Sequence, residues 1–327
     1  MQAVLDEFYA QIVAKLERDE LIPAYKRSMH REYLATVVDG LCGPWCGQDR
    51  RRACEAAVAG AVAYHGRAVR ENGSVCPLGK HHDMLYVMAR LAMDADASPE
   101  PVAALLTAIY TCEKTLEKLF EGAVVGSKVA RMISGRWTDF GATVADNRTA
   151  LGFYMDRATR ARLRLDGRRM QDVWMRSYQA APVMVAAATG DVAAVAMLLR
   201  YGPDERSVRA AIAYLRRRSA DRDRGPPFPD RVQSCLELLL RAVACEGGER
   251  GSVSGDEDRC GGGYGSGNDY GGCGSSGGVK VVPVPPTLLH LARCAVRNAL
   301  HQNFNLPHGI PQLPVPRSLV SYLDLEC

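Results

Sequence analysis

The stretch APVMVAAATGDVAAVAMLLRYG at residues 181–202 decides the fold, because it predicts two short helices joined by a tight turn. Pro182 suits the first turn of a helix, where its missing N–H is not needed. Gly190 and Gly202 are placed to end the two helices, since glycine adopts the left-handed conformation that closes a helix. The small Ala186 and Ala187 let the paired helices approach closely. The predicted inner face of the second helix consists of Val195, Leu198 and Leu199.

One helix pair of this size cannot bury both of its faces, so it needs stacked neighbours. Apolar residues recur at three- and four-residue spacing early in the chain and again at 84–120, where a proline-containing break falls at 98–101. Two apolar stretches at 207–215 and 235–243 are predicted to form the helices of a following unit, with a charged and proline-rich loop at 216–229 between them. The sequence therefore predicts an all-α chain, a helical solenoid with few regular repeats.

The composition argues against several classes of protein. The chain has 327 residues, is 47% hydrophobic and carries a formal net charge of only +4. A sizeable core is therefore expected, without the strong basic excess of most nucleic-acid-binding proteins. Charged residues interrupt the first twenty positions, which is unlike a secretory signal, and no run of about eighteen apolar residues predicts a membrane span. We expect an intracellular protein, placed in the cytoplasm with the nucleus left open, whose eleven cysteines remain thiols.

The chain divides by composition into four parts. Residues 246–280 are rich in Gly and Ser and hold few apolar side chains, so a flexible linker is predicted there. An N-terminal helical region at 1–80 and a region of degenerate repeats at 81–245 precede the linker. A short C-terminal module at 284–327 follows it.

The C-terminal module begins with a predicted helix. Thr287 can cap this helix, and it follows prolines that cannot belong to one. The apolar side covers nearly half of the circumference, which is more than one packing seam needs, so part of it suits a partner's groove. That side holds Leu288, Leu291, Ala292, Ala295, Val296 and Ala299, and the opposite side holds His290, Arg293, Arg297 and His301.

A second motif in the module is Leu-Pro-Val-Pro at residues 313–316. Two prolines at alternate positions fix an extended backbone and present Leu313 and Val315 rigidly. A short helix over 317–323 is predicted to follow, with one face formed by Leu319, Tyr322 and Leu323.

This combination resembles the SOCS box. The first helix of that family, the BC box, begins with Ser or Thr, then Leu, three residues, Cys, three residues and an aliphatic residue. Thr287, Leu288 and Val296 match this pattern, and Ala292 stands where Cys is usual. The family's Cullin 5 box is Leu-Pro-aliphatic-Pro followed by Leu-x-x-Tyr-Leu, which residues 313–316 with Leu319, Tyr322 and Leu323 match in full.

The helix pair at 181–202 resembles an ankyrin repeat, whose pattern is T-P-L-H-x-A-A-x-x-G-H, then Val, then Leu-Leu, then x-x-G. The spacing is the same, with Ala181 in place of Thr and Met184 in place of His. Ankyrin repeats followed by a SOCS box define the ankyrin repeat and SOCS box family, so the resemblance implies the substrate-recognition adaptor of a ubiquitin ligase.

The resemblance also implies partners and contact residues. Elongin C, which travels with Elongin B, would bind Leu288, Leu291, Ala292 and Val296. Cullin 5, with its RING partner, would bind Leu313, Pro314, Val315 and Pro316. The repeats would hold a protein substrate that the sequence does not identify.

Other candidate sites carry weaker signals. Cys42, Cys46, Cys76 and His81 offer zinc-binding groups at a spacing that fits no common zinc module. Cys42 and Cys46 also have three intervening residues, where a redox motif has two. The GAVVGSK segment at 122–128 lacks the spacing and order of a phosphate-binding loop and suits a turn between helices. Acidic residues are mixed into the arginine-rich stretches, which favours a solvated face over contact with RNA.

We therefore expect no metal, no cofactor, no nucleic-acid partner and no membrane partner. No nucleophile, base and orienting group stand at recognisable spacing, so no enzymatic activity is expected either. The alternative to a ligase adaptor is a non-catalytic ankyrin scaffold in intracellular signalling. In that case the C-terminal helices only cap the stack and bind no Elongin C.

Overall fold

Helices make up the fold in the computed structural model of this chain. The structure describes residues 7, 9–11, 47–76, 80–126, 143–220, 230–244 and 286–326, and within these ranges it contains no strand beyond two isolated bridges at tight turns. The all-α prediction is therefore confirmed for the described residues. The predicted linker at 246–280 lies outside them.

The helix bounds are as follows. The α-helices are α3 (Gly47–Glu71), α4 (Lys80–Asp94), α5 (Pro99–Glu113), α6 (Glu117–Val124), α8 (Val144–Arg160), α9 (Pro182–Thr189), α10 (Val192–Arg200), α11 (Glu205–Ala220), α12 (Asp230–Ala242), α13 (Leu288–Gln302) and α14 (Arg317–Leu323). Short 3-10 helices are η1 (Met170–Asp172), η2 (Arg176–Tyr178) and η4 (Ile310–Gln312). None of the described helices is both long enough and apolar enough to cross a membrane.

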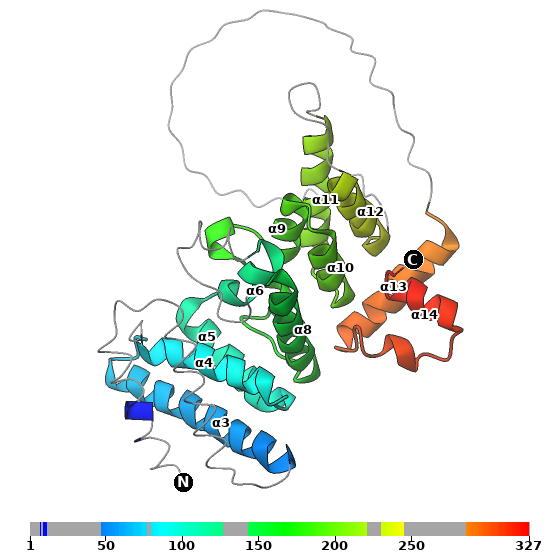
Figure 1. The fold of residues 1–327 in the computed structure, drawn as a ribbon. Helices are drawn as coiled ribbons and strands as arrows, with labels where there is room; N and C mark the ends of the chain where they lie inside the picture. Colours follow the sequence, from blue (N-terminus) through cyan, green and yellow to red (C-terminus); the bar gives the residue numbers. More distant parts are fainter. Residues whose placement is uncertain are drawn as a thin grey trace, which may run out of the picture.

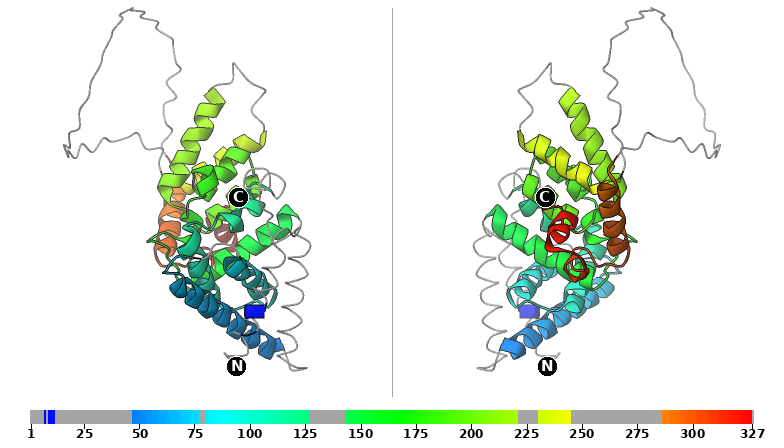
Figure 2. Two further views of the ribbon diagram at one scale, coloured as in Figure 1. Left: turned by 90° about the vertical axis from the view of Figure 1, so that its left-hand side faces the viewer. Right: turned by 90° about the vertical axis from the view of Figure 1, so that its right-hand side faces the viewer.

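The helices form a stack that runs from α3 at one end to α11 and α12 at the other (Figures 1 and 2). Helix α3 packs against α4 and α5, α5 packs against α8, and α8 packs against α6. Helix α6 also contacts α9, which packs against α10, α11 and α12. The buried apolar side chains of the stack form one continuous cluster. Helices α13 and α14 lie to one side, next to α10 (Figure 1).

Residues 181–202 form the predicted helix pair, α9 and α10. Pro182 occupies the first turn of α9, and Gly190 closes that helix at a φ of 72°. The side chain of Asp191 then caps α10 by accepting a hydrogen bond from the backbone N–H of Ala194 at 3.0 Å. Gly202 follows α10 at a φ of 66°. The predicted inner face is buried, as expected for Val195, Leu198 and Leu199.

Several boundaries differ from the sequence-based ones. Helix α5 begins at Pro99, so the prolines at 98–101 start a helix where a break was expected. The helix predicted to continue to residue 120 is divided at Lys114, whose φ of 55° ends α5. Helix α11 continues through Ala220, so residues 216–220 are helical where a loop was expected. Arginine is a good helix former and needs no apolar partner at an exposed helix end.

Gly122 lies inside α6, where a turn was expected, and it faces α8. A Cβ atom at this position would lie only 2.6 Å from Cγ of Asn147. Asn147 is buried in α8 and donates a hydrogen bond from Nδ2 to the carbonyl of Thr143 at 2.7 Å, so its side chain is not free to move. The missing side chain of Gly122 therefore allows the close approach of α6 and α8.

We predict that Gly122→Ala lowers the free energy of unfolding by about 1–3 kcal/mol, because the new methyl group overpacks the contact with Asn147. Gly152→Ala in α8 is a matched control, since no atom lies within 4 Å of its added Cβ. That control should be neutral or stabilising by up to about 1 kcal/mol. Denaturant titration measures both variants, and equal stabilities would contradict the packing of α6 on α8.

Candidate functional site

The C-terminal module consists of α13, a turn through a cis Leu306–Pro307 bond, η4 and α14. Thr287 caps α13 as expected, and its Oγ1 accepts a hydrogen bond from the backbone N–H of His290 at 3.2 Å. The module has a small core of its own, separate from that of the stack. Its buried members are Leu306, Ile310 and Leu323.

Arg297 joins this module to the stack. Its side chain is 6% exposed. Nη1 donates to the carbonyl of Leu323 in α14 at 2.6 Å, and Nη2 donates to the carbonyl of Leu199 in α10. The last carbonyls of a helix have no partner within the helix, so one guanidinium here satisfies the ends of two helices while belonging to a third. Burial lowers the pKa of Arg297 to about 10, which leaves it protonated at neutral pH.

Arg293 is the second arginine of α13 that points into the protein, and its side chain is 5% exposed. Its guanidinium lies 4.2 Å from the centroid of the Tyr322 ring, a favourable cation–π distance. Nη2 of Arg293 donates to Nδ1 of His290 at 2.9 Å, and Nε2 of His290 donates to the carbonyl of Val243, after α12, at 2.7 Å. Because Nδ1 accepts and Nε2 donates, this geometry fits a neutral imidazole.

Further polar contacts hold the module against α10 and against the segment before η1. Arg200 forms a two-point ion pair with Asp324, with contacts of 3.1 Å and 2.5 Å. His308 lies 3.1 Å from Asp156 of α8, but its Nε2 makes no hydrogen bond with the described residues and burial lowers the pKa of the imidazole, so the two residues are neighbours and not an ion pair. Arg169 is buried, although the arginine-rich stretch was expected to be a solvated face; it donates to the carbonyl of His301. Burial and the nearby arginines lower the pKa of the His301 side chain to about 4.

The apolar side of α13 faces away from the stack. Leu288 is 85% exposed and Leu289 is 53% exposed. Three alanines on the same helix are also exposed, Ala292, Ala295 and Ala299. Leu291 and Val296 are half-buried, and Val296 packs against the small core of the module. The helix therefore buries Arg293 and Arg297 and exposes Leu288 and Leu289, which reverses the usual orientation of an amphipathic surface helix.

The residues of the Leu-Pro-Val-Pro element alternate between half-buried and exposed. Leu313 and Val315 are half-buried and pack against the module's core, while Pro314 and Pro316 are exposed. Leu313 has an extended backbone, with φ −71° and ψ 140°. The prolines, rather than the aliphatic side chains, are thus the freely accessible part of this element.

Of the remaining metal-ligand candidates, only Cys76 has a described side chain. Cys42 and Cys46 lie outside the described residues, as does the side chain of His81. Cys76 lies in the turn after α3. Sequence reasoning missed the inward role of Arg293 and Arg297. Their spacing of four residues on one helical face was visible, but a charged face normally points to water.

We predict that Arg297→Ala loosens the module from α10, because the buried carbonyls of Leu199 and Leu323 lose this donor. The free energy of unfolding should fall by about 1–3 kcal/mol or more. Amide hydrogen exchange should accelerate in α13 and α14 while α3–α5 keep their protection. Arg317→Ala, at an exposed arginine of α14, is the control and should leave exchange unchanged. Unchanged exchange in the Arg297 variant would mean that other contacts hold the module.

Comparison with known proteins identifies the module but not the rest of the chain. No curated protein and no solved structure matches the sequence. The ankyrin interpretation of residues 81–245 therefore stays a prediction. A family model for the SOCS box matches residues 284–324, the segment that holds α13, η4 and α14. A SOCS box is the adaptor element of Elongin B/C–Cullin ubiquitin ligases, so the chain carries the module of a ligase adaptor.

Proposed function

We propose that this chain is the non-catalytic substrate-recognition adaptor of a Cullin 5–RING ubiquitin ligase, joined to it through Elongin C with Elongin B. The observation that carries this proposal is the orientation of α13. Leu288 is 85% exposed, while Arg293 and Arg297 of the same helix are buried. Both features are unfavourable for the chain alone, since apolar area stays in water and charges leave it. A partner that covers the leucines removes the first of these costs.

The exposed side of α13 offers a surface with one protruding anchor. Leu288 stands in the first turn, beyond the contacts of the stack. Ala292 is exposed and small, so a partner can come close to the helix there. Leu291 and Val296 are half-buried and present only their outer edges. Leu288, Leu291, Ala292 and Val296 are therefore our proposed Elongin C contacts, with Leu288 as the anchor.

Cullin 5 is the proposed partner of residues 313–316. In this element Leu313 and Val315 brace the backbone against the module's core, and Pro314 and Pro316 face outward. Because proline fixes the backbone, these exposed residues lose little conformational entropy on binding, which suits a selective contact. The RING partner would reach the complex through Cullin 5.

The helical stack is the proposed holder of a protein substrate. We infer that residues 81–245 are degenerate ankyrin-type repeats, with 181–202 as the clearest, and that 1–80 are an N-terminal helical region. An adaptor of this kind works by raising the local concentration of substrate near the ubiquitin-carrying enzyme, without chemistry of its own. The cytoplasm is the compartment where we expect it to act.

One observation favours a second candidate, the non-ligase scaffold. The module closes the carbonyl end of α10 through Arg297, and Arg200 pairs with Asp324, so α13 and α14 do cap the stack. Capping alone, however, gives no reason for the exposure of Leu288. Binding of the parent protein to the Elongin B–Elongin C pair separates the two candidates.

We predict that Leu288→Ala weakens binding to the Elongin B–Elongin C pair about tenfold or more, because burying a leucine side chain contributes roughly 1.5–3 kcal/mol. The melting temperature should stay unchanged, since the side chain is exposed in the free chain. Calorimetry or surface plasmon resonance on the purified full chain measures the binding.

Leu289→Ala is the matched control, because it removes the same atoms from the neighbouring position and should cost less affinity. Equal losses for both leucines would indicate nonspecific apolar contact. The ligase proposal fails if the parent chain does not bind the Elongin pair at micromolar concentration, and Ala292, in place of the usual Cys, would then be the first position to restore.

We predict that the double variant Pro314→Ala/Pro316→Ala reduces Cullin 5 recruitment severalfold and leaves Elongin C binding intact, because both prolines are exposed and lie beyond α13. Pro311→Ala changes another exposed proline outside the element and should have no effect. Recruitment is measured with the purified Elongin-bound chain and Cullin 5. Undiminished Cullin 5 binding in the double variant would remove residues 313–316 from the interface.

A further inference from the structure

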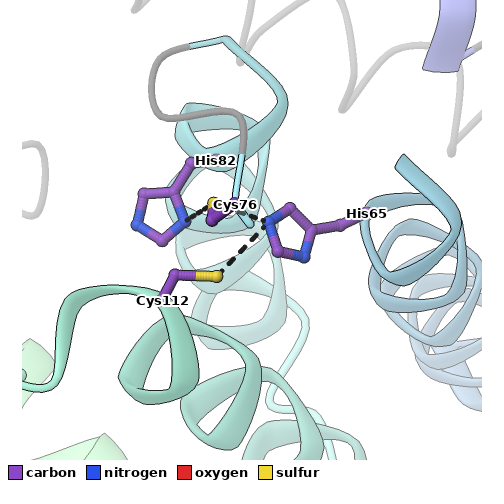
Figure 3. Close-up of side chains that lie close together, drawn as sticks. All are labelled: His65, Cys76, His82 and Cys112. Atoms are coloured by element: carbon purple, nitrogen blue, oxygen red, sulfur yellow. Dashed lines mark hydrogen bonds between the residues drawn. The ribbon is translucent and has the colours of Figure 1, made fainter. Parts of the chain in front are cut away.

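Two histidines and two cysteines converge near the N-terminal end of the stack (Figure 3). His65 comes from α3, Cys76 from the turn after it, His82 from α4 and Cys112 from α5. The two imidazoles are 3% and 2% exposed, and both thiols are half-buried. One ligand atom from each residue lies within 4.8 Å of the other three.

Three sulfur–nitrogen distances in the cluster are close to those around a single tetrahedral ion. Zn–S bonds of about 2.3 Å and Zn–N bonds of about 2.0–2.1 Å place sulfur and nitrogen about 3.5–3.6 Å apart in a tetrahedron. Here Sγ of Cys76 lies 3.4 Å from Nε2 of His65 and 3.9 Å from Nδ1 of His82. Sγ of Cys112 lies 3.6 Å from the same Nε2 of His65. The remaining pairs of ligand atoms lie within 4.8 Å of one another, so small movements of the side chains are needed to complete the coordination.

The ring of His82 is held in the orientation that metal binding requires. Its Nε2 pairs with Oε1 of Glu113 at 2.7 Å, which leaves Nδ1 directed at the sulfur of Cys76. Glu113 is fixed in turn by the hydroxyl of Tyr86 at 2.8 Å and by Lys118. A carboxylate behind a metal-binding histidine is the usual outer support of such sites, because it sets the tautomer and strengthens the ligand nitrogen.

The backbone after α3 is shaped to bring Cys76 back to the helix that carries His65. Gly73 and Ser74 both adopt left-handed conformations, at φ 66° and 64°. The side chain of Asn72 donates to the carbonyl of Val75 at 3.0 Å and closes the turn. A left-handed conformation at Ser74 is unfavourable for a residue with a side chain, so other contacts must hold the turn in place. Coordination of Cys76 would supply one.

We propose that His65, Cys76, His82 and Cys112 bind one zinc ion as a structural site that ties α3, α4 and α5 together. Two sulfurs and two nitrogens in a tetrahedron favour zinc among the divalent metals. Four protein ligands leave no open position, which is typical of structural rather than catalytic zinc. This site departs from the expectation of no metal, and it is independent of the proposed ligase function.

Two other chemistries compete for the same cluster. A Cys76–Cys112 disulfide would use the sulfurs alone and gives no role to two buried imidazoles and the carboxylate behind one of them. A network of thiol–imidazole hydrogen bonds would use all four residues without an ion. Metal content and thiol state distinguish the three.

The first experiment uses the full chain as purified without added metal. Elemental analysis should find about one zinc per chain that survives dialysis against a weak chelator. Removing zinc with a strong chelator should lower the melting temperature, and adding zinc back should restore it, since a ligand that binds only the folded state stabilises that state. A metal content well below one, with a melting temperature insensitive to the chelator, would overturn the site in favour of the hydrogen-bonded network.

The second experiment replaces zinc by cobalt(II) in the same chain. Tetrahedral coordination by cysteines gives cobalt(II) intense visible bands together with thiolate-to-cobalt charge-transfer absorption. The absence of both would overturn the site. Alkylation and mass spectrometry of the unreduced protein measure the thiols. A stoichiometric Cys76–Cys112 disulfide would show that the pair is a redox couple instead.

Variants assign the ligands. Cys112→Ser and His82→Gln should each lose the stoichiometric zinc and the cobalt bands. Cys54→Ser is the matched control, because Cys54 is a buried thiol of α3 outside the cluster. Its Sγ donates a hydrogen bond to the carbonyl of Leu91. The control should keep its zinc. Full zinc content in both ligand variants would exclude these residues, and the measurements on the parent chain remain decisive if a variant fails to fold.

Discussion

The guanidinium of Arg297 ties the C-terminal module to the stack, and the accessibility of α13 depends on that contact. It reaches one carbonyl in α10 and one in α14 from a third helix, α13. Removing a charge from water is costly, so such a contact forms only where several acceptors meet. Helix ends provide them, because their last carbonyls have no partners within the helix. With the arginines of α13 facing inward, Leu288 and Leu289 of the same helix are left exposed.

The same contacts join the proposed ligase-binding surface to the proposed substrate-binding stack. Arg200 at the end of α10 pairs with Asp324, and His290 in α13 reaches the carbonyl of Val243 after α12. The module is therefore held at several points, at α10 and after α12, by polar contacts that are sensitive to geometry. An adaptor held in this way presents its two surfaces at a fixed angle, which determines where a substrate stands relative to the rest of the ligase.

The sequence predicts the short helix pair best and the polar contacts least. Pro182 and Gly190 mark a helix start and end by local backbone preferences, so α9 and α10 follow from nearby residues alone. The last turn of α11 was missed because charged residues carry no apolar periodicity. The inward turn of Arg293 and Arg297 depends on carbonyls far away in the chain. His65, Cys76, His82 and Cys112 have no motif spacing either, and only the packing of three helices brings them together.

The uncovered leucines of α13 also bear on the fate of the chain before it finds a partner. Leu288 and Leu289 lie side by side with a row of exposed alanines, and such a patch promotes self-association of free chains. Newly made chains would then be exposed to aggregation and to degradation by cellular quality control. If a partner covers this patch, chains made in excess over that partner keep it exposed and stay open to both processes.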